Sequence, residues 1–362
     1  MAAYGLYTHI ASNRRRSVAL LVGLFFLVYL MVFAGALVAE GMMSDAPLGE
    51  LVSRARYDFV AALPFATIGT AIWIIVAYKF HQRMIDALTG GHDVSRADQP
   101  RLYNLLENLC ISRGIPMPKL KLVDSSALNA FATGMTEQQY AISVTTGLLS
   151  KLNDAELEAV LAHELTHIRN GDVRMMVVAM VIAGVISFLS ELFFRLLFRG
   201  GVRVSGGSSD RKGGGGAILI GVALVAVAWL LSLVIRFALS RSREFLADAG
   251  AVELTKNPDA MIKALRKIEG RGELPEATSA VMEMCIDNPR EGFADLFATH
   301  PSIDRRVSAL VRYAGGHDPG PLSPVATDDA LPEDAPAPYV PKRQPLPGGP
   351  WAPLPDTPAG AR

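Results

Sequence analysis

Four long apolar segments constrain this 362-residue chain more than any other feature. Three of them contain no charged side chain, and each is long enough to cross the hydrocarbon core of a bilayer as a helix. They are residues 17–39, 59–78 and 213–235. The fourth, 175–190, is shorter, and it extends to residue 198 if Glu191 and Arg195 pair with each other or lie at the membrane interface. Since half of all residues are also hydrophobic, we expect a multi-pass membrane protein with four transmembrane helices.

Basic residues beside the first span predict the orientation in the membrane. Arg14, Arg15 and Arg16 favour a cytoplasmic N-terminus. Pairs of crossings then return residues 79–174 and 240–362 to the cytoplasm. The loop 199–216 would lie outside although its charged residues are mostly basic. Either this loop departs from the rule that basic loops stay in the cytoplasm, or the second hairpin does not fully span the membrane. In both cases the two polar segments stay on one side.

The segment His163-Glu164-Leu165-Thr166-His167 carries the strongest chemical signal. Residues four apart share one face of a helix, so both imidazoles can reach the same metal ion. Glu164 can then hold the water molecule that such an ion acidifies. An amphipathic helix alone would explain the apolar stripe around these residues, but not two histidines beside a glutamate.

A catalytic zinc ion needs a third protein ligand. Position 173 is valine, which excludes the pattern with a third histidine there, and Asp172 has a simpler explanation as the cap of the next helix. Glu244 is the better candidate. It lies four residues before Asp248, so one carboxylate could bind the metal while the other accepts the free N–H of a ligating histidine. The alternative is a surface charge cluster with the neighbouring arginines.

The polar segments predict a mostly helical α+β domain with a small antiparallel sheet beside the zinc helix. The expected strands are 119–124, 129–134 and 140–145. The expected helices are 101–113, 259–269 and 302–313, besides those of His163 and Glu244.

Several motifs, in order along residues 1–315, resemble the HtpX family of membrane-bound zinc endopeptidases, within a wider group that includes the CAAX prenyl proteases. These motifs are Asn129–Gly134, Thr146–Leu149, Leu161–His167, Asn170–Asp172, Ser240–Asp248, and Thr299–Ser302 with Arg306.

The resemblance implies a zincin-like (gluzincin) catalytic domain with one zinc ion per chain. The ion would be bound by His163, His167 and Glu244, with Glu164 as general base and Asp248 as a supporting carboxylate. It also implies that the strand beginning at Asn129 is an edge along which an extended peptide could lie, although plain sheet structure would explain it too.

His300 and Arg306 are harder to assign. His300 precedes Pro301, which suits the first position of a helix, so His300 should lie near a helix N-terminus. It could contact the reacting substrate, occupy the fourth metal position, or simply cap or pack. Arg306 could pair with a carboxylate of the site.

Five regions follow. They are a transmembrane hairpin (1–80), a first catalytic segment (81–174), a second hairpin (175–239), a second catalytic segment (240–315) and a proline-rich disordered tail (316–362). The resemblance implies a stress-response protease of the cell inner membrane, with its site facing the cytoplasm, that cleaves cytosolic segments of misfolded or damaged membrane proteins.

Two alternatives stay open: a protease with its metal inside the bilayer, which the charged flanks of the zinc helix disfavour, and a non-catalytic scaffold or holdase stabilised by zinc. A net charge of zero does not favour a nucleic-acid partner. The two cysteines, Cys110 and Cys285, are expected to be free thiols. A homo-oligomer is left open.

Overall fold

The computed structural model describes residues 6–199, 214–237, 242–288 and 300–320. The chain divides into two compact units, Met1–Pro321 and Leu322–Arg362, and all described elements belong to the first. The expectations for most of the basic loop 199–216 and for the tail from residue 321 onward fall outside the described residues, as do the motif residues 240, 241 and 299.

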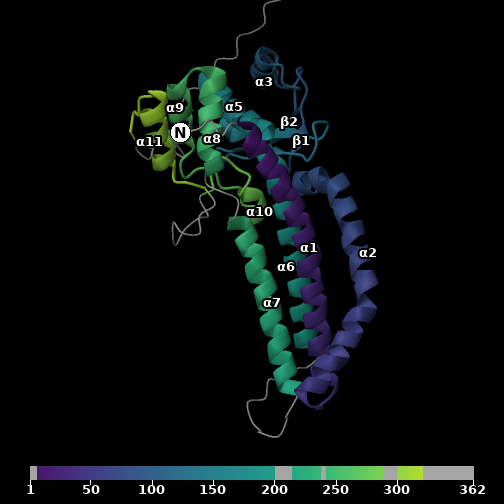
Figure 1. Ribbon diagram of the computed structural model, residues 1–362. Coiled ribbons are helices and arrows are strands. Elements are labelled where there is room, and N and C mark those ends of the chain that lie inside the picture. Colours follow the sequence, from purple (N-terminus) through teal and green to yellow (C-terminus); the bar gives the residue numbers. More distant parts are fainter. Residues whose placement is uncertain (1–5, 200–213, 238–241, 289–299, 321–362) are drawn as a thin grey trace, which may run out of the picture. The chain divides into compact units, whose positions relative to one another are not determined.

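Four long helices form what we call the helical bundle. They are α1 (Leu6–Met43), α2 (Leu48–Thr89), α6 (Asp172–Arg199) and α7 (Gly214–Phe237). Figure 1 shows them running side by side, with α1 in contact with each of the other three. Each contains a stretch long and apolar enough to cross a membrane, which confirms the four predicted spans. In α6, Arg195 Nε donates to Glu191 Oε1 at 2.9 Å, the pairing expected from their spacing.

The remaining elements form the polar region, defined here as the described residues of 90–171, 242–288 and 300–320. Its helices are α3 (Pro100–Arg113), α4 (Thr146–Lys151), α5 (Asp154–Asn170), α8 (Ser242–Thr255), α9 (Pro258–Ile268), α10 (Ser279–Met282) and α11 (Ile303–Ala314). The three predicted helices 101–113, 259–269 and 302–313 are confirmed within a residue at each end. Pro301 was expected to be the first residue of a helix, but α11 begins two residues later. Ser302, which follows Pro301, has an extended backbone and is the N-cap.

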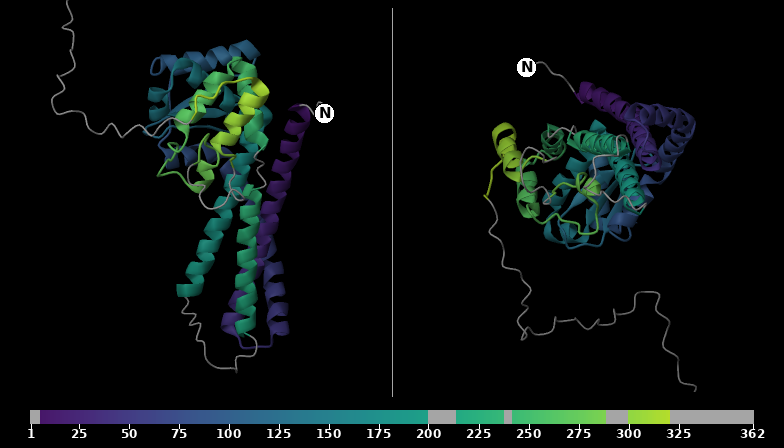
Figure 2. Two further views of the ribbon diagram at one scale, coloured as in Figure 1. Left: turned by 90° about the vertical axis from the view of Figure 1, so that its left-hand side faces the viewer. Right: turned by 90° about the horizontal axis from the view of Figure 1, so that it is seen from below.

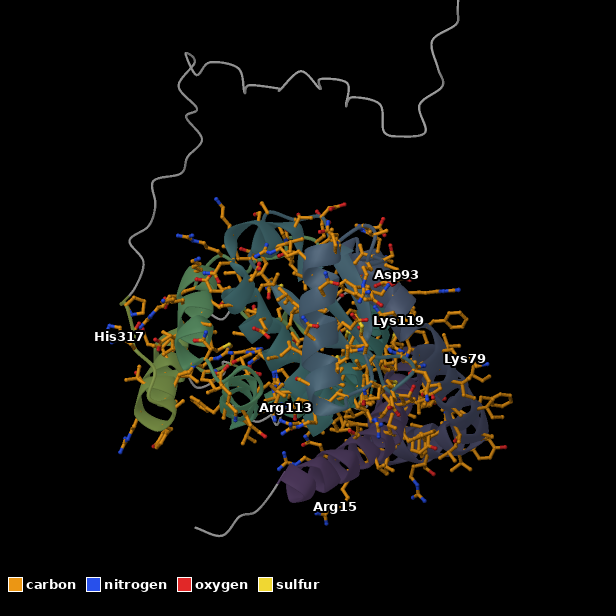
Figure 3. The ribbon with its side chains drawn as sticks, turned by 90° about the horizontal axis from the view of Figure 1, so that it is seen from above. Arg15, Lys79, Asp93, Arg113, Lys119 and His317 are labelled. Carbon is orange, nitrogen blue, oxygen red and sulfur yellow. The ribbon has the colours of Figure 1, made fainter. Side chains whose placement is uncertain are left out.

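The sheet is small, as predicted, but it is mixed and not purely antiparallel. Its strands are β1 (His92–Asp93), β2 (Lys119–Val123), β3 (Ala130–Thr133) and β4 (Ala141–Thr145), in the order β1-β2-β4-β3. Strands β3 and β4 form an antiparallel hairpin, and β4 then pairs with β2 in parallel. The hairpin joins the sheet through its second strand, and this order could not be read from the alternation of residues. In Figure 3, Asp93 and Lys119 lie at one side of the polar region and His317 at the opposite side.

Helix α2 links the bundle to the sheet because it continues well beyond its apolar segment. Lys121 of β2, only 5% exposed, places Nζ 3.0 Å from Asp86 Oδ2 of α2 and 2.6 Å from Asp93 Oδ1. Thr133 of β3 donates to Gln82 Oε1 at 2.6 Å. A buried lysine needs such carboxylate partners, so these contacts attach the membrane helix to two strands.

Helix α5 lies at the centre of the polar region and packs against α8, α9, α3 and the sheet. It begins with a capping box in which Asn153 and Glu156 satisfy each other's backbone N–H groups. It ends at Gly171, whose φ of 74° is left-handed, and α6 starts at Asp172. These local signals explain both ends of α5, and the chain passes directly from the buried helix into a membrane span.

Candidate metal centre

His163, His167 and Glu244 converge in the interior of the polar region. The two histidine Nε2 atoms, one turn apart on α5, are separated by 3.1 Å. From α8, Glu244 Oε2 lies 3.5 Å from His163 Nε2, and Oε1 lies 3.7 Å from His167 Nε2. One atom from each residue can be chosen so that all three lie within 4.8 Å of one another, close enough to hold a metal ion.

The close packing of α8 on α5 brings Glu244 to the histidines across a long separation in sequence. Gly250 allows this packing, since a β-carbon there would lie 2.4 Å from Thr166 Cγ2 of α5. The hairpin of α6 and α7 is inserted between the two halves of the site. A helix pair within the polar region therefore sets the site geometry.

A carboxylate stands behind each histidine. Asp248 Oδ1 lies 3.0 Å from His163 Nδ1, the arrangement expected for Asp248. Asp172 Oδ2 lies 3.0 Å from His167 Nδ1. A carboxylate can only accept a hydrogen bond, so each Nδ1 carries a hydrogen, and Nε2 is the nitrogen that can bind a metal once it is deprotonated.

Asp172 was predicted only as a helix cap, and its contact with His167 was missed. Its position directly after the helix-ending Gly171 is the signal that could have revealed it, because a left-handed turn brings the next residue back toward the last turn of α5.

Burial and neighbouring charges shift the pKa values of three groups in the cluster. Burial raises the pKa of Glu164, which is 2% exposed. Burial acts in the same direction on Glu244, but His300 and His167 outweigh it and hold the pKa of Glu244 well below its usual value. Although burial lowers the pKa of His167, the carboxylates of Glu244 and Asp172 raise it to about 10. The carboxylates thus stabilise positive charge where the imidazoles meet.

A divalent cation fits this donor set. The buried charged groups at the cluster include four carboxylates and two guanidinium groups: Glu164, Asp172, Glu244, Asp248, Arg243 and Arg306. With these carboxylates ionised and the imidazoles neutral as metal ligands, these six groups carry two more negative than positive charges, which a divalent ion would neutralise. Among the described residues, Glu244 Oε2 is buried without a hydrogen-bond donor, as a metal-binding oxygen would be before an ion is added.

Arg306 and His300 both reach the cluster. Arg306, 1% exposed, donates from Nε and Nη2 to both oxygens of Asp248, at 2.8 and 2.6 Å. Its Nη1 lies 3.8 Å from Glu244 Oε2, so Arg306 pairs with a site carboxylate as expected. His300 Nδ1 lies 3.6 Å from Glu244 Oε1, and its Nε2 donates to the carbonyl of Glu283 at 3.1 Å. His300 therefore sits beside the ligands and contacts the segment that precedes Cys285.

Asn129 has an internal role in place of the expected substrate contact. Its side chain is fully buried, its amide donates to the carbonyls of Gly272 and Asp287, and its oxygen accepts from the N–H of Ile286. Ile286 also donates to the carbonyl of Ala130. Residues 285–286 of the same chain thus cover the outer edge of β3 at its beginning, where the family resemblance had implied an open edge.

Comparison with known proteins places this architecture in a class. Residues 96–314 match peptidase family M48. A protease HtpX homologue of Bacteroides fragilis is 36% identical over 324 residues, which cover 86% of this chain and all of that protein. One from Listeria monocytogenes is 36% identical over 84% of this chain and 99% of its own length. The crystal structure of S. mikatae Ste24p has a TM-score of 0.41 and 20% identity, covering 67% of this chain and 57% of that one.

The bundle and the buried site are those of a multi-pass membrane protease of a metallopeptidase family. The chain belongs to peptidase family M48 and, within it, to the HtpX proteases.

Proposed function

We propose that the protein is a zinc-dependent endopeptidase that cleaves cytosolic segments of misfolded or damaged membrane proteins at the cell inner membrane. The observation that carries this proposal is the convergence of His163, His167 and Glu244 beside the buried Glu164. Two imidazoles and one carboxylate form a donor set typical of catalytic zinc, which leaves one position for water or substrate.

The role proposed for each residue follows from its position in the cluster. His163, His167 and Glu244 would hold the ion, while Asp248 and Asp172 orient the two imidazoles through Nδ1. When bound, zinc would supply a Lewis acid that acidifies a water molecule and polarises the scissile carbonyl. Residues 81–174 and 240–315 would form one catalytic domain carried by the hairpins 1–80 and 175–239, an arrangement that the packing of α5 on α8 supports.

Glu164 would move the proton. It would accept a proton from the attacking water as the new C–O bond forms, and would then deliver that proton to the leaving amine as the amide C–N bond breaks. A carboxyl group whose pKa is raised by burial suits both steps, because it can hold the proton between them.

The test uses Glu164→Gln in the full-length protein, with Glu158→Gln as control because Glu158 lies on α5 outside the cluster. Glu164→Gln should retain about one zinc per chain and lose cleavage of casein and of a destabilised membrane protein by about 10²–10⁴-fold or more. Glu158→Gln should cleave normally, and its cleavage sites should map to cytosolic segments.

The second candidate is the zinc-stabilised scaffold or holdase, favoured by the position of His300 beside the ligands, where it could close the site. If Glu164→Gln keeps its biological activity in cells while cleavage is lost, the scaffold is correct and the protease proposal fails.

A further inference from the structure

Asn13 of α1 reaches from the membrane bundle to the metal centre. Its Nδ2 donates to Asp172 Oδ1 at 2.7 Å and to the carbonyl of Asn170 at 3.2 Å. The other oxygen of Asp172 accepts from His167 Nδ1 at 3.0 Å. A continuous path of hydrogen bonds therefore runs from the first membrane helix to a candidate metal ligand.

The contact between Asn13 and Asp172 is buried. The side chain is 1% exposed and Asp172 is fully buried, so an amide–carboxylate hydrogen bond between them is formed away from water, where its loss is costly. The carbonyl of Asn170 lies at the C-terminal end of α5, where helix carbonyls lack partners within the helix. Asn13 thus binds both the end of α5 and the start of α6.

Figure 2 shows how α1 can do this. The first turns of α1 extend past the other bundle helices and lie alongside the polar region. Asn13 precedes the stretch of α1 suited to cross the membrane, which begins at Arg15. The contact therefore lies at the end of the bundle next to the metal centre.

The two candidate histidine ligands are supported in parallel ways. His163 Nδ1 contacts Asp248, whose two oxygens are held by Arg306 of α11. His167 Nδ1 contacts Asp172, which is held by Asn13 of α1. Groups that fix such carboxylates control the orientation of the imidazole and its affinity for a metal.

We propose that Asn13 is a positioning residue for the metal centre: it orients Asp172, and through it His167, so that α1 completes the site as well as anchoring the protein. The inference rests on the proposed function only in taking His163, His167 and Glu244 as the metal ligands. It predicts that the polar region separated from α1 would bind metal less tightly than the whole chain does.

The experiment measures metal affinity of full-length protein in detergent by chelator competition, together with the absorption spectrum of the cobalt-substituted protein. Asn13→Ala should weaken the affinity about tenfold and change the cobalt spectrum, and kcat should fall while KM stays unchanged. Ser17→Ala is the matched control, because Ser17 is buried one turn further along α1 and its hydroxyl donates only within that helix, to the carbonyl of Asn13. It should behave as wild type.

A double-mutant cycle separates positioning from general damage. In an Asp172→Asn background, Asn13→Ala should cause little further loss of affinity, since the two residues act through one path. An equal loss in both backgrounds, or wild-type affinity and spectrum for Asn13→Ala, overturns the proposal. If Asn13→Ala does not accumulate, Asn13→Ser replaces it, because its shorter hydroxyl does not reach Asp172, and wild-type affinity in that variant has the same meaning. A wild-type protein that binds no metal would instead refute the proposed function.

Discussion

The helical bundle and the polar region bury side chains under different rules. The bundle has a small core made of apolar residues, and large apolar side chains such as Phe26 and Phe65 are 61% and 77% exposed. In the polar region, Arg243 and Arg306 are among the largest fully buried side chains. A bilayer acts as the solvent for the outside of the bundle, so packing there needs little polarity. The polar region has a larger apolar core and also buries paired charges that hold a site.

The largest expected difference between the two regions concerns ion pairs. Arg306→Met leaves Asp248 buried without its guanidinium partner and should lower the free energy of unfolding by about 3–5 kcal/mol. Arg54→Met in the bundle removes an exposed pair with Glu50 and should change it by less than about 0.5 kcal/mol. Chemical denaturation of metal-free protein in detergent measures both. Similar costs for the two variants would contradict the comparison.

The next effect concerns buried hydrogen bonds between distant segments. Asn129→Ala strands the carbonyls of Gly272 and Asp287 and should cost about 2–3 kcal/mol. In the bundle, Thr70 donates only to Ala66 one turn earlier in the same helix, so Thr70→Val should cost less than about 1 kcal/mol. Thermal unfolding of each variant gives the order. Faster hydrogen exchange at residues 285–286 in Asn129→Ala would locate the loosened segment.

Close packing between helices should matter for metal binding in the polar region, but not in the bundle. Gly250→Ala places a β-carbon against Thr166, so α8 should shift, stability should fall by about 1–3 kcal/mol, and metal affinity should weaken because Glu244 lies on the same helix. Gly184→Ala in α6 meets no atom within 4 Å and should be neutral or slightly stabilising. Calorimetry with added zinc tests the pair. Normal metal binding by Gly250→Ala would show that the α5–α8 distance does not set the site.

The smallest effect is expected on the outer face of the bundle. Phe26→Leu keeps an apolar side chain facing lipid and should alter stability by no more than about 0.5 kcal/mol. Phe131→Leu, the same change at a fully buried position of β3, should cost about 1 kcal/mol. Unfolding in lipid nanodiscs compares the two. A larger cost at Phe26 would indicate that its face is packed against a partner.

Local patterns were enough to predict most of the elements. The apolar segments, the helix from Asp154 to Asn170 and its end at Gly171 depend on composition, capping and residues at most a few positions apart. The candidate ligands His163 and His167 were also predictable from a local pattern, since a one-turn spacing on a helix defines their geometry. Glu244 could be predicted because its own spacing to Asp248 and the family resemblance pointed to it.

Contacts between distant segments were not predictable in this way. The parallel pairing of β2 with β4 and the coverage of β3 by residues 285–286 both depend on which surfaces pack together. Asn13 is the clearest case, because 159 residues separate it from Asp172. No periodicity carries information across that distance.

By itself, the sequence determined that this chain has four apolar spans and a helix that presents two imidazoles beside a glutamate, because hydrophobicity and helical spacing act over short stretches of chain. Only the tertiary structure decided that Asp248 supports His163 and that a membrane helix supports Asp172 behind His167. Such contacts arise from the packing of whole helices, whose free energy is shared among many residues and is not written in any short segment.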